Sequence, residues 1–285
     1  MRFIVQPGPG PAERIQWVEA RGRRVAFALE PGRRLLDAVR DSFAEAGFAS
    51  GVLTLEGGAF GPLAYVIPAL SATGRNAAFY SETFRTAGPS RIRTAALTFG
   101  TREGAPFFHC HAFWTDADGQ LKGGHILPEE TVVAETIPAG GVGLAGALFT
   151  AEPDPETNFS LFGPVPDEAK AGDREGRLFA LRLRPNQDLA LALETFCRER
   201  GLAGAVLHGG VGSTIGARFE GGGGVEPFAT ELAIRTGRIG RNAAGELEAR
   251  VEATLVDLTG AVSAGTLVRG DNPILMTLEL VLEPA

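Results

Sequence analysis

An internal repeat constrains this chain more than any other feature of its sequence. Residues 24–58 and 178–212 align without a gap at an offset of 154 residues, so that Gly47 falls on Gly201. Each copy shows the same order of patterns: an apolar strand, a turn that contains proline, an amphipathic helix, a glycine and a second strand. The repeat therefore predicts two tandem domains of one fold.

The repeated unit predicts one helix and several strands. Apolar residues at every fourth position, followed by a glycine suited to the C′ position, predict a helix in each copy. They are Leu35, Val39, Phe43 and Gly47 in the first copy, and Leu189, Leu193, Cys197 and Gly201 in the second. Strand-like runs cover 25–29, 94–99, 107–114, 131–137, 247–255 and 274–282. The fold class we expect is α+β, with a mostly antiparallel sheet packed against one main helix in each domain.

Length and composition fit this division. A chain of 285 residues suits two domains, and its 39 glycines and 18 prolines favour short strands and turns. The segment 151–176 carries four prolines without a sustained period, which predicts a linker. The predicted domains are therefore residues 1–150 and 177–285.

The sequence shows no feature of membrane insertion or export. It contains no apolar run of 18 residues, and the segment 7–11 alternates proline and glycine before a signal-peptide core could form. The two cysteines, Cys110 and Cys197, lie far apart and define no disulfide framework. We expect a cytoplasmic protein without a membrane partner.

Charge is distributed unevenly between the halves. Residues 1–150 hold 14 basic and 14 acidic residues, which leaves 13 basic and 20 acidic residues of the chain's 27 and 34 for the remainder. Proteins that bind duplex DNA usually present a net cationic face. Neither half does, so the charge balance disfavours DNA as a partner without excluding a local patch such as residues 21–24.

Three of the four histidines fall in one short stretch, at His109, His111 and His125. In a strand, residues two apart share a face at a separation of about 6.6 Å, so His109 and His111 point together. Two imidazoles at that spacing can share a metal ion. A third imidazole from the facing strand would complete a set of three protein ligands, which leaves a zinc position open.

The position of His125 depends on the turn between the two strands. A three-residue loop at 117–119, with Gly119 in the left-handed conformation, sets His125 opposite His111. A two-residue loop would instead set it opposite Cys110, on the wrong face. Because Gly119 stands where the longer loop needs it, we predict that the three imidazoles converge on one face. We expect a divalent metal there, with zinc first and other imidazole-binding ions open.

At these residues the sequence resembles the plant and prokaryote conserved (PPC) domain, also called DUF296. The resemblance covers nearly the whole chain apart from the linker. The motifs that carry it are Gly104-Ala105-Pro106, His109-Cys110-His111, Asp116-Ala117-Asp118-Gly119 and Gly123-Gly124-His125. In the second copy the corresponding positions hold Arg250, Glu252 and Thr266, which marks a degenerate domain without the metal ligands.

The resemblance implies a compact α+β domain that forms homo-oligomers, typically trimers, and binds a divalent metal through these histidines. It leaves the activity unassigned, because bacterial relatives have no established reaction and plant relatives act at DNA through separate AT-hooks. Three classes of function therefore remain open: a metal-dependent enzyme or small-molecule binder, a DNA-binding regulatory protein, and an oligomeric assembly module with a structural metal.

Weaker signals compete with the histidine motif. Residues 21–24 resemble an AT-hook but lack its proline, and residues 141–146 match a dinucleotide fingerprint without the helix that should follow. The nearby candidates for acid–base catalysis are Lys122, Glu129 and Glu130. An exposed acidic turn after Pro128 explains the two glutamates better. The sequence supports no nucleophilic side chain.

Overall fold

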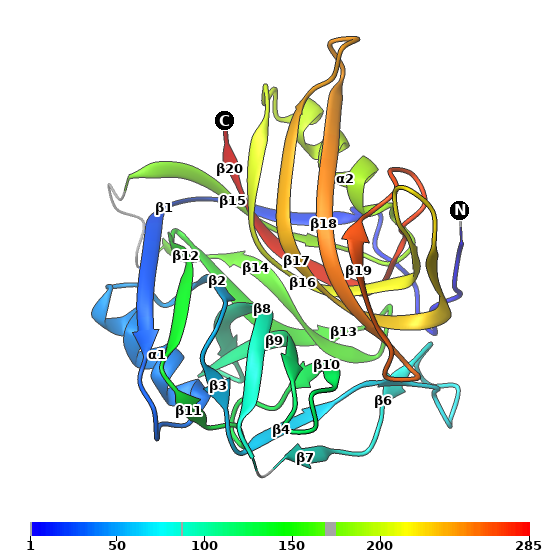
Figure 1. The fold of residues 1–285 in the computed structure, drawn as a ribbon. Helices are drawn as coiled ribbons and strands as arrows, with labels where there is room; N and C mark the ends of the chain where they lie inside the picture. The colour runs from blue at the N-terminus through cyan, green and yellow to red at the C-terminus, as the bar shows by residue number, and fades with distance from the viewer. Residues whose placement is uncertain (1, 87, 169–174) are drawn as a thin grey trace.

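The structure is a computed structural model that describes residues 2–86, 88–168 and 175–285 (Figure 1). The first copy comprises β1 (Ile15–Leu29), α1 (Leu35–Glu45), β2 (Ser50–Leu55), β3 (Ala59–Phe60), β4 (Leu63–Val66), β5 (Pro68–Ala69), β6 (Phe79–Tyr80), β7 (Phe84–Thr86), β8 (Ser90–Arg102), β9 (Ala105–Thr115), β10 (Leu121–Ile126), β11 (Val133–Glu135) and β12 (Ile137–Ala145). A hairpin of β13 (Ala147–Asp154) and β14 (Phe159–Pro166) follows. The second copy comprises β15 (Gly176–Leu183), α2 (Leu189–Glu199), β16 (Ala205–Arg218), β17 (Gly224–Arg241), β18 (Leu247–Asp257), β19 (Val262–Thr266) and β20 (Ile274–Pro284).

The two copies share one sheet topology. In the first, the strands lie in the order β1, β12, β2, β8, β9, β10, and every neighbouring pair is antiparallel. In the second, β15, β20, β16, β17, β18 and β19 lie in the corresponding order, again antiparallel. The predicted α+β fold in two tandem copies is confirmed.

The predicted helix in each copy is confirmed. Both helices have 11 residues, and each begins and ends at positions separated by the offset of the repeat. Gly47 and Gly201 follow with φ angles of 81° and 65°, the left-handed conformation that glycine adopts without strain. The apolar face of each helix is buried against the sheet of its own copy.

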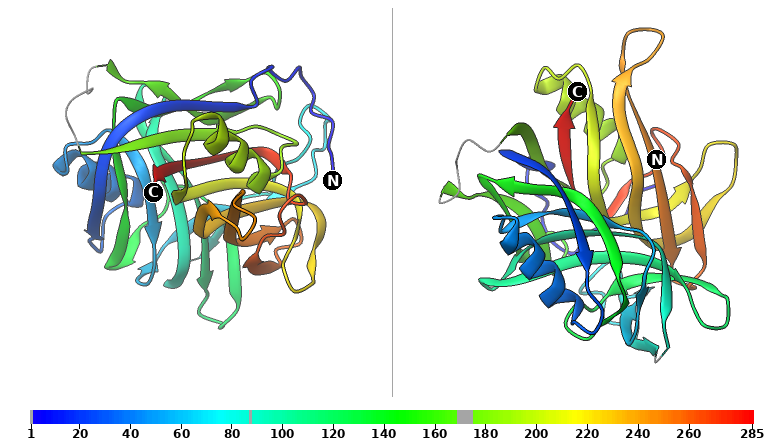
Figure 2. Two further views of the ribbon diagram at one scale, coloured as in Figure 1. Left: turned by 90° about the horizontal axis from the view of Figure 1, so that it is seen from above. Right: turned by 60° about the vertical axis from the view of Figure 1, so that its left-hand side comes forward.

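One strand belongs to both sheets. The second half of β1, residues 21–29, pairs with β12 of the first copy, whereas its first half, residues 15–22, pairs with β15 of the second. This long strand runs along both halves of the molecule (Figure 1, Figure 2). The two sheets are therefore joined by backbone hydrogen bonds as well as by side-chain packing.

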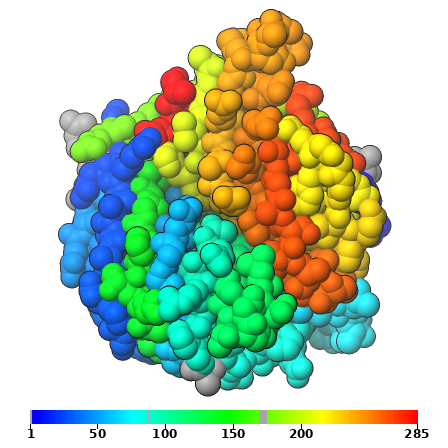
Figure 3. All heavy atoms as spheres, in the orientation of Figure 1, coloured from blue at the N-terminus to red at the C-terminus, as the bar shows by residue number. Residues whose placement is uncertain are grey.

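The sheets also pack against each other, and strand alternation decides which residues meet. On β9, Phe108, Cys110 and Trp114 point into the core of the first copy. Phe113 points the other way and packs with Ala233 and other apolar residues of the second copy. The histidines at odd positions share this second face. In the space-filling view the two copies meet along a broad boundary (Figure 3).

Most of the predicted linker forms a β-hairpin, which corrects the expectation of an irregular segment. Strands β13 and β14 pair antiparallel over their full length, and Phe149 and Phe162 are buried in a core shared by the two copies. The prolines suggested a break, but proline is tolerated in strands with a free edge. Residues 169–174 of the predicted linker lie outside the described residues, and the predicted domain bounds stay predictions.

Within the described residues, no helix is both long enough and apolar enough to span a membrane. The cytoplasmic location stays a prediction.

Candidate metal centre

The hairpin of β9 and β10 has the geometry that the sequence predicts. The Asp116 N–H donates to the Gln120 carbonyl at 3.0 Å, and Gly119 adopts a φ of 81°. The loop is therefore the three-residue type, and His125 pairs directly with His111. The predicted convergence of the three imidazoles follows from this local register.

The three imidazole rings form one compact cluster. Ring centroids lie 4.7 Å apart for His109 and His111, 5.0 Å for His109 and His125, and 5.3 Å for His111 and His125. One nitrogen from each ring lies within 4.8 Å of the others. The Nε2 atoms of His109 and His111 are 3.1 Å apart, close to the separation of about 3.3 Å between two nitrogens on one tetrahedral zinc ion. The cluster can hold a metal ion.

A backbone carbonyl of the second copy orients His111. Its Nδ1 lies 3.0 Å from the Leu232 carbonyl oxygen, which can only accept, so Nδ1 carries the proton and donates. The Nε2 lone pair then faces the other two imidazoles. Burial, followed by the neighbouring His109 and His125, holds the pKa of His111 well below its ordinary value. His111 is therefore a neutral imidazole, the form that binds metal.

A buried carboxylate of the second copy contacts His109. Glu279 Oε2 lies 2.7 Å from Nδ1 of His109, and the Glu279 side chain is fully buried. The Thr277 hydroxyl donates to Glu279 Oε1 at 3.1 Å, and Arg182 Nε donates to the Thr277 hydroxyl at 3.2 Å. Arg182 also pairs with Asp154. This chain of contacts holds His109 by Nδ1 and leaves Nε2 toward the cluster.

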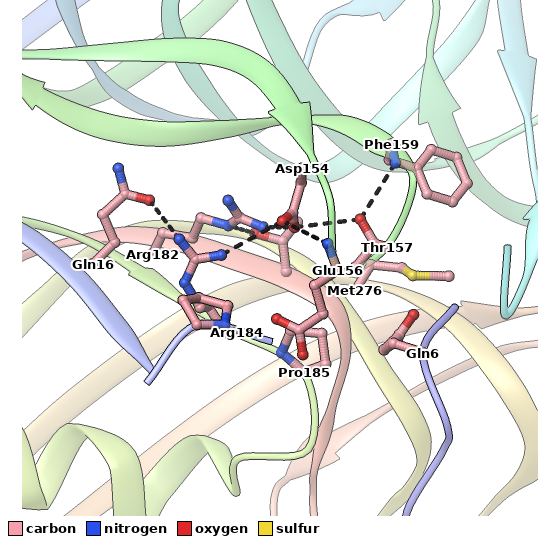
Figure 4. Close-up of polar contacts among 12 residues, drawn as sticks. Gln6, Gln16, Asp154, Glu156, Thr157, Phe159, Arg182, Arg184, Pro185 and Met276 are labelled. Carbon is pink, nitrogen blue, oxygen red and sulfur yellow. Dashed lines mark hydrogen bonds and ion pairs between the residues drawn. The ribbon is translucent and has the colours of Figure 1, made fainter. Parts of the chain in front are cut away.

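Arg182, at the far end of this series of hydrogen bonds, lies in a buried cluster of charged residues between β13 and β15. Figure 4 shows the Arg182 and Arg184 guanidinium groups directed at the Asp154 carboxylate. The pair with Arg182 is buried, and Arg184 is half-buried. The Thr157 hydroxyl donates to the same carboxylate at 3.3 Å. These contacts fix Arg182, and through it Thr277, in one position.

His125 provides the clearest sign that a ligand is needed. Its Nδ1 is buried and has no hydrogen-bond partner among the described residues. The Tyr80 ring lies against it, with centroids 5.1 Å apart. Burial and then the nearby His109 lower the pKa of His125 well below its ordinary value, which keeps the ring neutral. A buried ring nitrogen without a partner is costly, and a bound ligand would supply that partner.

A second buried acid, Glu231 on β17, lies beside the cluster. Its Oε1 is 3.9 Å from Nε2 of His111, and its Oε2 has no hydrogen-bond partner in the part of the chain that the structure describes. Burial raises the pKa of this carboxyl well above its ordinary value, although a hydrogen bond from the His125 backbone opposes the rise. Glu231 is therefore placed to exchange hydrogen bonds with a ligand at the cluster.

A cavity of about 50 Å³ opens on His109 and His111. Its polar lining groups other than the two histidines and Tyr80 come from the second copy, and its aromatic wall comes from β6 and β14. The lining residues are Pro68, Ala78, Phe79, Tyr80, His109, His111, Phe159, Leu161, Gly212, Ser213, Thr230, Glu231, Leu275, Met276 and Thr277. Both copies therefore build the site.

The acid–base candidates taken from the sequence do not join the cluster. Lys122 lies three residues from His125 on β10 and so on the opposite face, where it pairs with Asp116 at 2.6 Å. Glu130 pairs with Arg85, and Glu129 lies 3.8 Å from Arg102, all on the surface. The acids near the histidines are Glu231 and Glu279 instead.

Sequence reasoning missed both of these acids, although each left a signal. Glu231 lies in the apolar run 228–234, and Glu279 lies in the apolar run 274–282. A lone acid within an apolar strand is rarely placed in a core without a partner. The signal did not name the partner, because His109 lies 170 residues from Glu279.

In the second copy, the positions that correspond to the histidines are not a metal cluster. Glu252 pairs with Thr266 across β18 and β19, as His111 pairs with His125 in the first copy. Arg250 forms an ion pair with Glu220 at 3.1 Å, and half of its side chain is exposed. The backbone of the hairpin is kept, and the ligands are replaced.

The segments that resemble an AT-hook and a dinucleotide fingerprint lie in regular strands. In residues 21–24 of β1, a Cβ on Gly22 would come within 2.0 Å of the Gly143 carbonyl oxygen, so this segment is packed inside the sheet. Residues 141–146 fall mainly in β12, which leads into a strand rather than a helix. His208 pairs with Glu283 at 2.7 Å, away from the three clustered histidines.

The fold and the histidine cluster together define a tandem α+β protein with one candidate metal centre. The family model of the Plants and Prokaryotes Conserved (PCC) domain matches residues 18–138 and 170–285. The chain belongs to this family, and the resemblance to the PPC domain is confirmed in both copies. A comparison with curated proteins gives no match.

A comparison with solved structures gives matches over about half of this chain. The plant- and prokaryote-conserved (PPC) protein of Pyrococcus horikoshii is 16% identical, with a TM-score of 0.42, and covers 52% of this chain and 96% of its own. A metal-containing protein from Archaeoglobus fulgidus is 19% identical, with a TM-score of 0.39, over 50% and 94%. A protein from Ralstonia eutropha, named as a candidate DNA-binding protein, is 18% identical, with a TM-score of 0.37, over 50% and 95%.

Proposed function

We propose that this protein binds one divalent metal ion through His109, His111 and His125, with zinc as the leading candidate, and uses the metal to bind or convert a small molecule. The observation that carries the proposal is the meeting of three ring nitrogens within 4.8 Å. Neutral imidazoles whose other nitrogen is held by an acceptor are the usual ligands of zinc in proteins.

An open coordination position favours a binding or catalytic site over a structural one. Structural zinc sites are usually closed by four protein ligands, whereas catalytic sites use three and leave the fourth position to water or substrate. The cluster supplies three ligands, and the cavity meets it at His109 and His111. Glu231, with an oxygen that lacks a partner, lies beside His111. A bound metal would supply Lewis acidity there.

The structure offers less support for DNA as a partner. The hook-like residues 21–24 are fixed in β1, where Arg24 pairs with Glu283 at 3.1 Å, so they offer no free arm to a minor groove. A gel shift with AT-rich duplex at physiological salt should show no retardation.

Two further proposals concern the oligomeric state and the location of the protein. By family resemblance we propose a homo-oligomer, typically a trimer, which sedimentation tests. We also propose a cytoplasmic location, which cell fractionation tests.

Metal analysis tests the main proposal. Purified protein should contain about one divalent ion per chain, and the His109→Ala, His111→Ala variant should contain about none, because two of three ligands are lost. His208→Ala is the matched control, since His208 contacts Glu283 instead of the cluster. Equal metal content in the wild type and the double variant would contradict the proposal.

Chelation separates an open site from a structural one. If the metal serves a small molecule, its removal should leave the fold and the oligomeric state largely intact. The apolar core of each copy is formed mainly by its own helix and strands. Unfolding or dissociation on chelation would instead support the assembly module with a structural metal.

A further inference from the structure

The cavity beside the histidines has a polar part and an apolar part, and β20 contributes to both, with Thr277 and Met276. Its polar groups surround the metal cluster, and its remaining lining is aromatic or aliphatic. On this basis we infer that the cavity binds a short organic compound with an oxygen-bearing head group, either a carboxylate or a neutral carbonyl, and a small apolar body. This inference rests on the proposed metal centre and names the ligand class for it.

The polar part can receive an oxygen head group. Glu231 is buried, 5% exposed, and presents Oε2 without a partner among the described residues. Ser213 Oγ accepts a hydrogen bond from the Met276 N–H at 3.0 Å, which leaves its own hydroxyl proton for a ligand. His109 and His111 line the same cavity. An oxygen atom here would meet the open metal position and hydrogen-bonding groups together.

The apolar part selects against a fully hydrated ligand. Phe159 lies 5.7 Å from Phe79 and 5.8 Å from Tyr80, measured between ring centroids, so the three rings form one wall. Ala78 and Met276 are buried in the same apolar cluster. Figure 4 shows Met276 and Phe159 beside each other. An inorganic anion such as phosphate would lose hydration against this wall without compensation.

The volume limits the size of the ligand. A single water needs roughly 10–15 Å³ of such space, so a cavity of about 50 Å³ has room for about three to five waters. Because bonded atoms lie closer together than waters do, it admits a compound of only about four to six non-hydrogen atoms. Isobutyrate and isobutyramide have this size and the same shape, but only isobutyrate is charged. The pair therefore distinguishes a carboxylate ligand from a neutral carbonyl ligand.

Calorimetric titration of the zinc-loaded protein tests the inference. We expect one of the two organic probes to bind with a dissociation constant of about 1 mM, the range for so small a ligand, and at least about tenfold more tightly than inorganic phosphate. Tighter binding of isobutyrate would identify a carboxylate ligand, and tighter binding of isobutyramide a neutral carbonyl ligand.

Two variants of Leu161 locate the bound probe. Leu161 lines the cavity and is half-buried, so Leu161→Trp should fill the space and weaken binding at least about tenfold. Leu70→Trp is the matched control, because Leu70 is 66% exposed and does not line the cavity; it should leave binding unchanged. If Leu161→Trp fails to fold, Leu161→Ala should enlarge the cavity and shift the preference toward a longer compound, such as hexanoate.

Metal analysis of the same samples separates the two claims. A protein that retains zinc but binds neither organic probe, or binds phosphate equally well, overturns the ligand class and leaves the metal centre standing. Unchanged probe binding in Leu161→Trp overturns the location. A protein that binds no metal overturns the proposed function, whatever the probes do.

Discussion

The two copies have one topology but different side chains at corresponding positions. The first carries three histidines on β9 and β10, and the second carries two buried acids on β17 and β20. The hairpin turns at Asp116 and Asp257 form the same hydrogen bonds, so they occupy corresponding positions in the two copies. Arg91 pairs with the residue before Asp116, and Glu231 pairs with the residue before Asp257. Arg91 of the first copy therefore stands at the position of Glu231.

The same comparison holds for the other acid. The repeat sets Val25 on Phe179, and these residues pair with Gly141 and Leu282 respectively. Pro138 lies three residues before Gly141, and Glu279 lies three residues before Leu282. Pro138 of the first copy therefore stands at the position of Glu279. Each copy therefore lacks what the other supplies, and the face-to-face packing assembles one complete site from two incomplete ones. The second copy is more than a scaffold, because it orients His109 and His111 and lines the cavity.

Introducing histidines into the second copy is the strongest test of this comparison. The triple variant Arg250→His, Glu252→His, Thr266→His should gain a second divalent ion, because Glu252 and Thr266 keep the pairing of the native hairpin. Its affinity should be about 10–100-fold below that of the first site, since Arg91 and Pro138 of the first copy stand where the native site has Glu231 and Glu279. Metal content and competition titration measure both quantities.

The double variant with Thr266 retained is the matched control, and it should gain no tightly bound ion. Equal affinity at the grafted and native sites would show that the acids of the second copy contribute nothing to metal binding.

The next prediction removes one acid from the native site. Glu279→Gln should weaken metal binding about 10–100-fold, because the amide holds His109 less firmly than a carboxylate does. Glu283→Gln changes a glutamate–histidine pair that lies within the second copy, at His208, and serves as the control. A competition assay with a chromophoric chelator gives both dissociation constants; identical values would contradict a role for Glu279.

The sequence predicts the histidine cluster but not its surroundings, and distance along the chain explains the difference. The turn at Gly119 and strand alternation fix His111 and His125 locally. The partners of His109 and His111 lie 170 and 121 residues away, and no local pattern specifies which face of one sheet meets the other. A lone acid in an apolar strand indicates a buried partner without identifying it.

The prediction of an irregular linker at residues 151–176 is wrong for a related reason. The prolines of this segment suggest a break when only neighbouring residues are considered. In the fold, Phe149 and Phe162 are buried between the two copies, and this tertiary packing outweighs the local preference.

A smaller effect tests the hydrogen-bond chain behind Glu279. Thr277→Val removes the hydroxyl that joins Arg182 to Glu279, and it should weaken metal binding by less than about tenfold while lowering the unfolding free energy by about 1–3 kcal/mol. Thr277→Ser restores the hydroxyl and should recover both values. The absorption spectrum of the Co²⁺-loaded protein should shift in Thr277→Val and return in Thr277→Ser, whereas loss of packing alone would leave it unchanged.

The smallest effect concerns the glutamate–histidine pair that lies outside the site. The hydrogen bond from His208, together with Arg24, lowers the pKa of Glu283 below its ordinary 4.5. The resulting stabilisation is present above pH 4.5 and is lost as the pH falls through the lowered pKa. With a third of its side chain exposed, Glu283→Gln should cost less than about 1 kcal/mol at pH 7, and the difference from the wild type should vanish in acid. Urea unfolding at both pH values measures it, and a loss as large as that of Thr277→Val would mean that this exposed pair stabilises the fold as strongly as the buried chain.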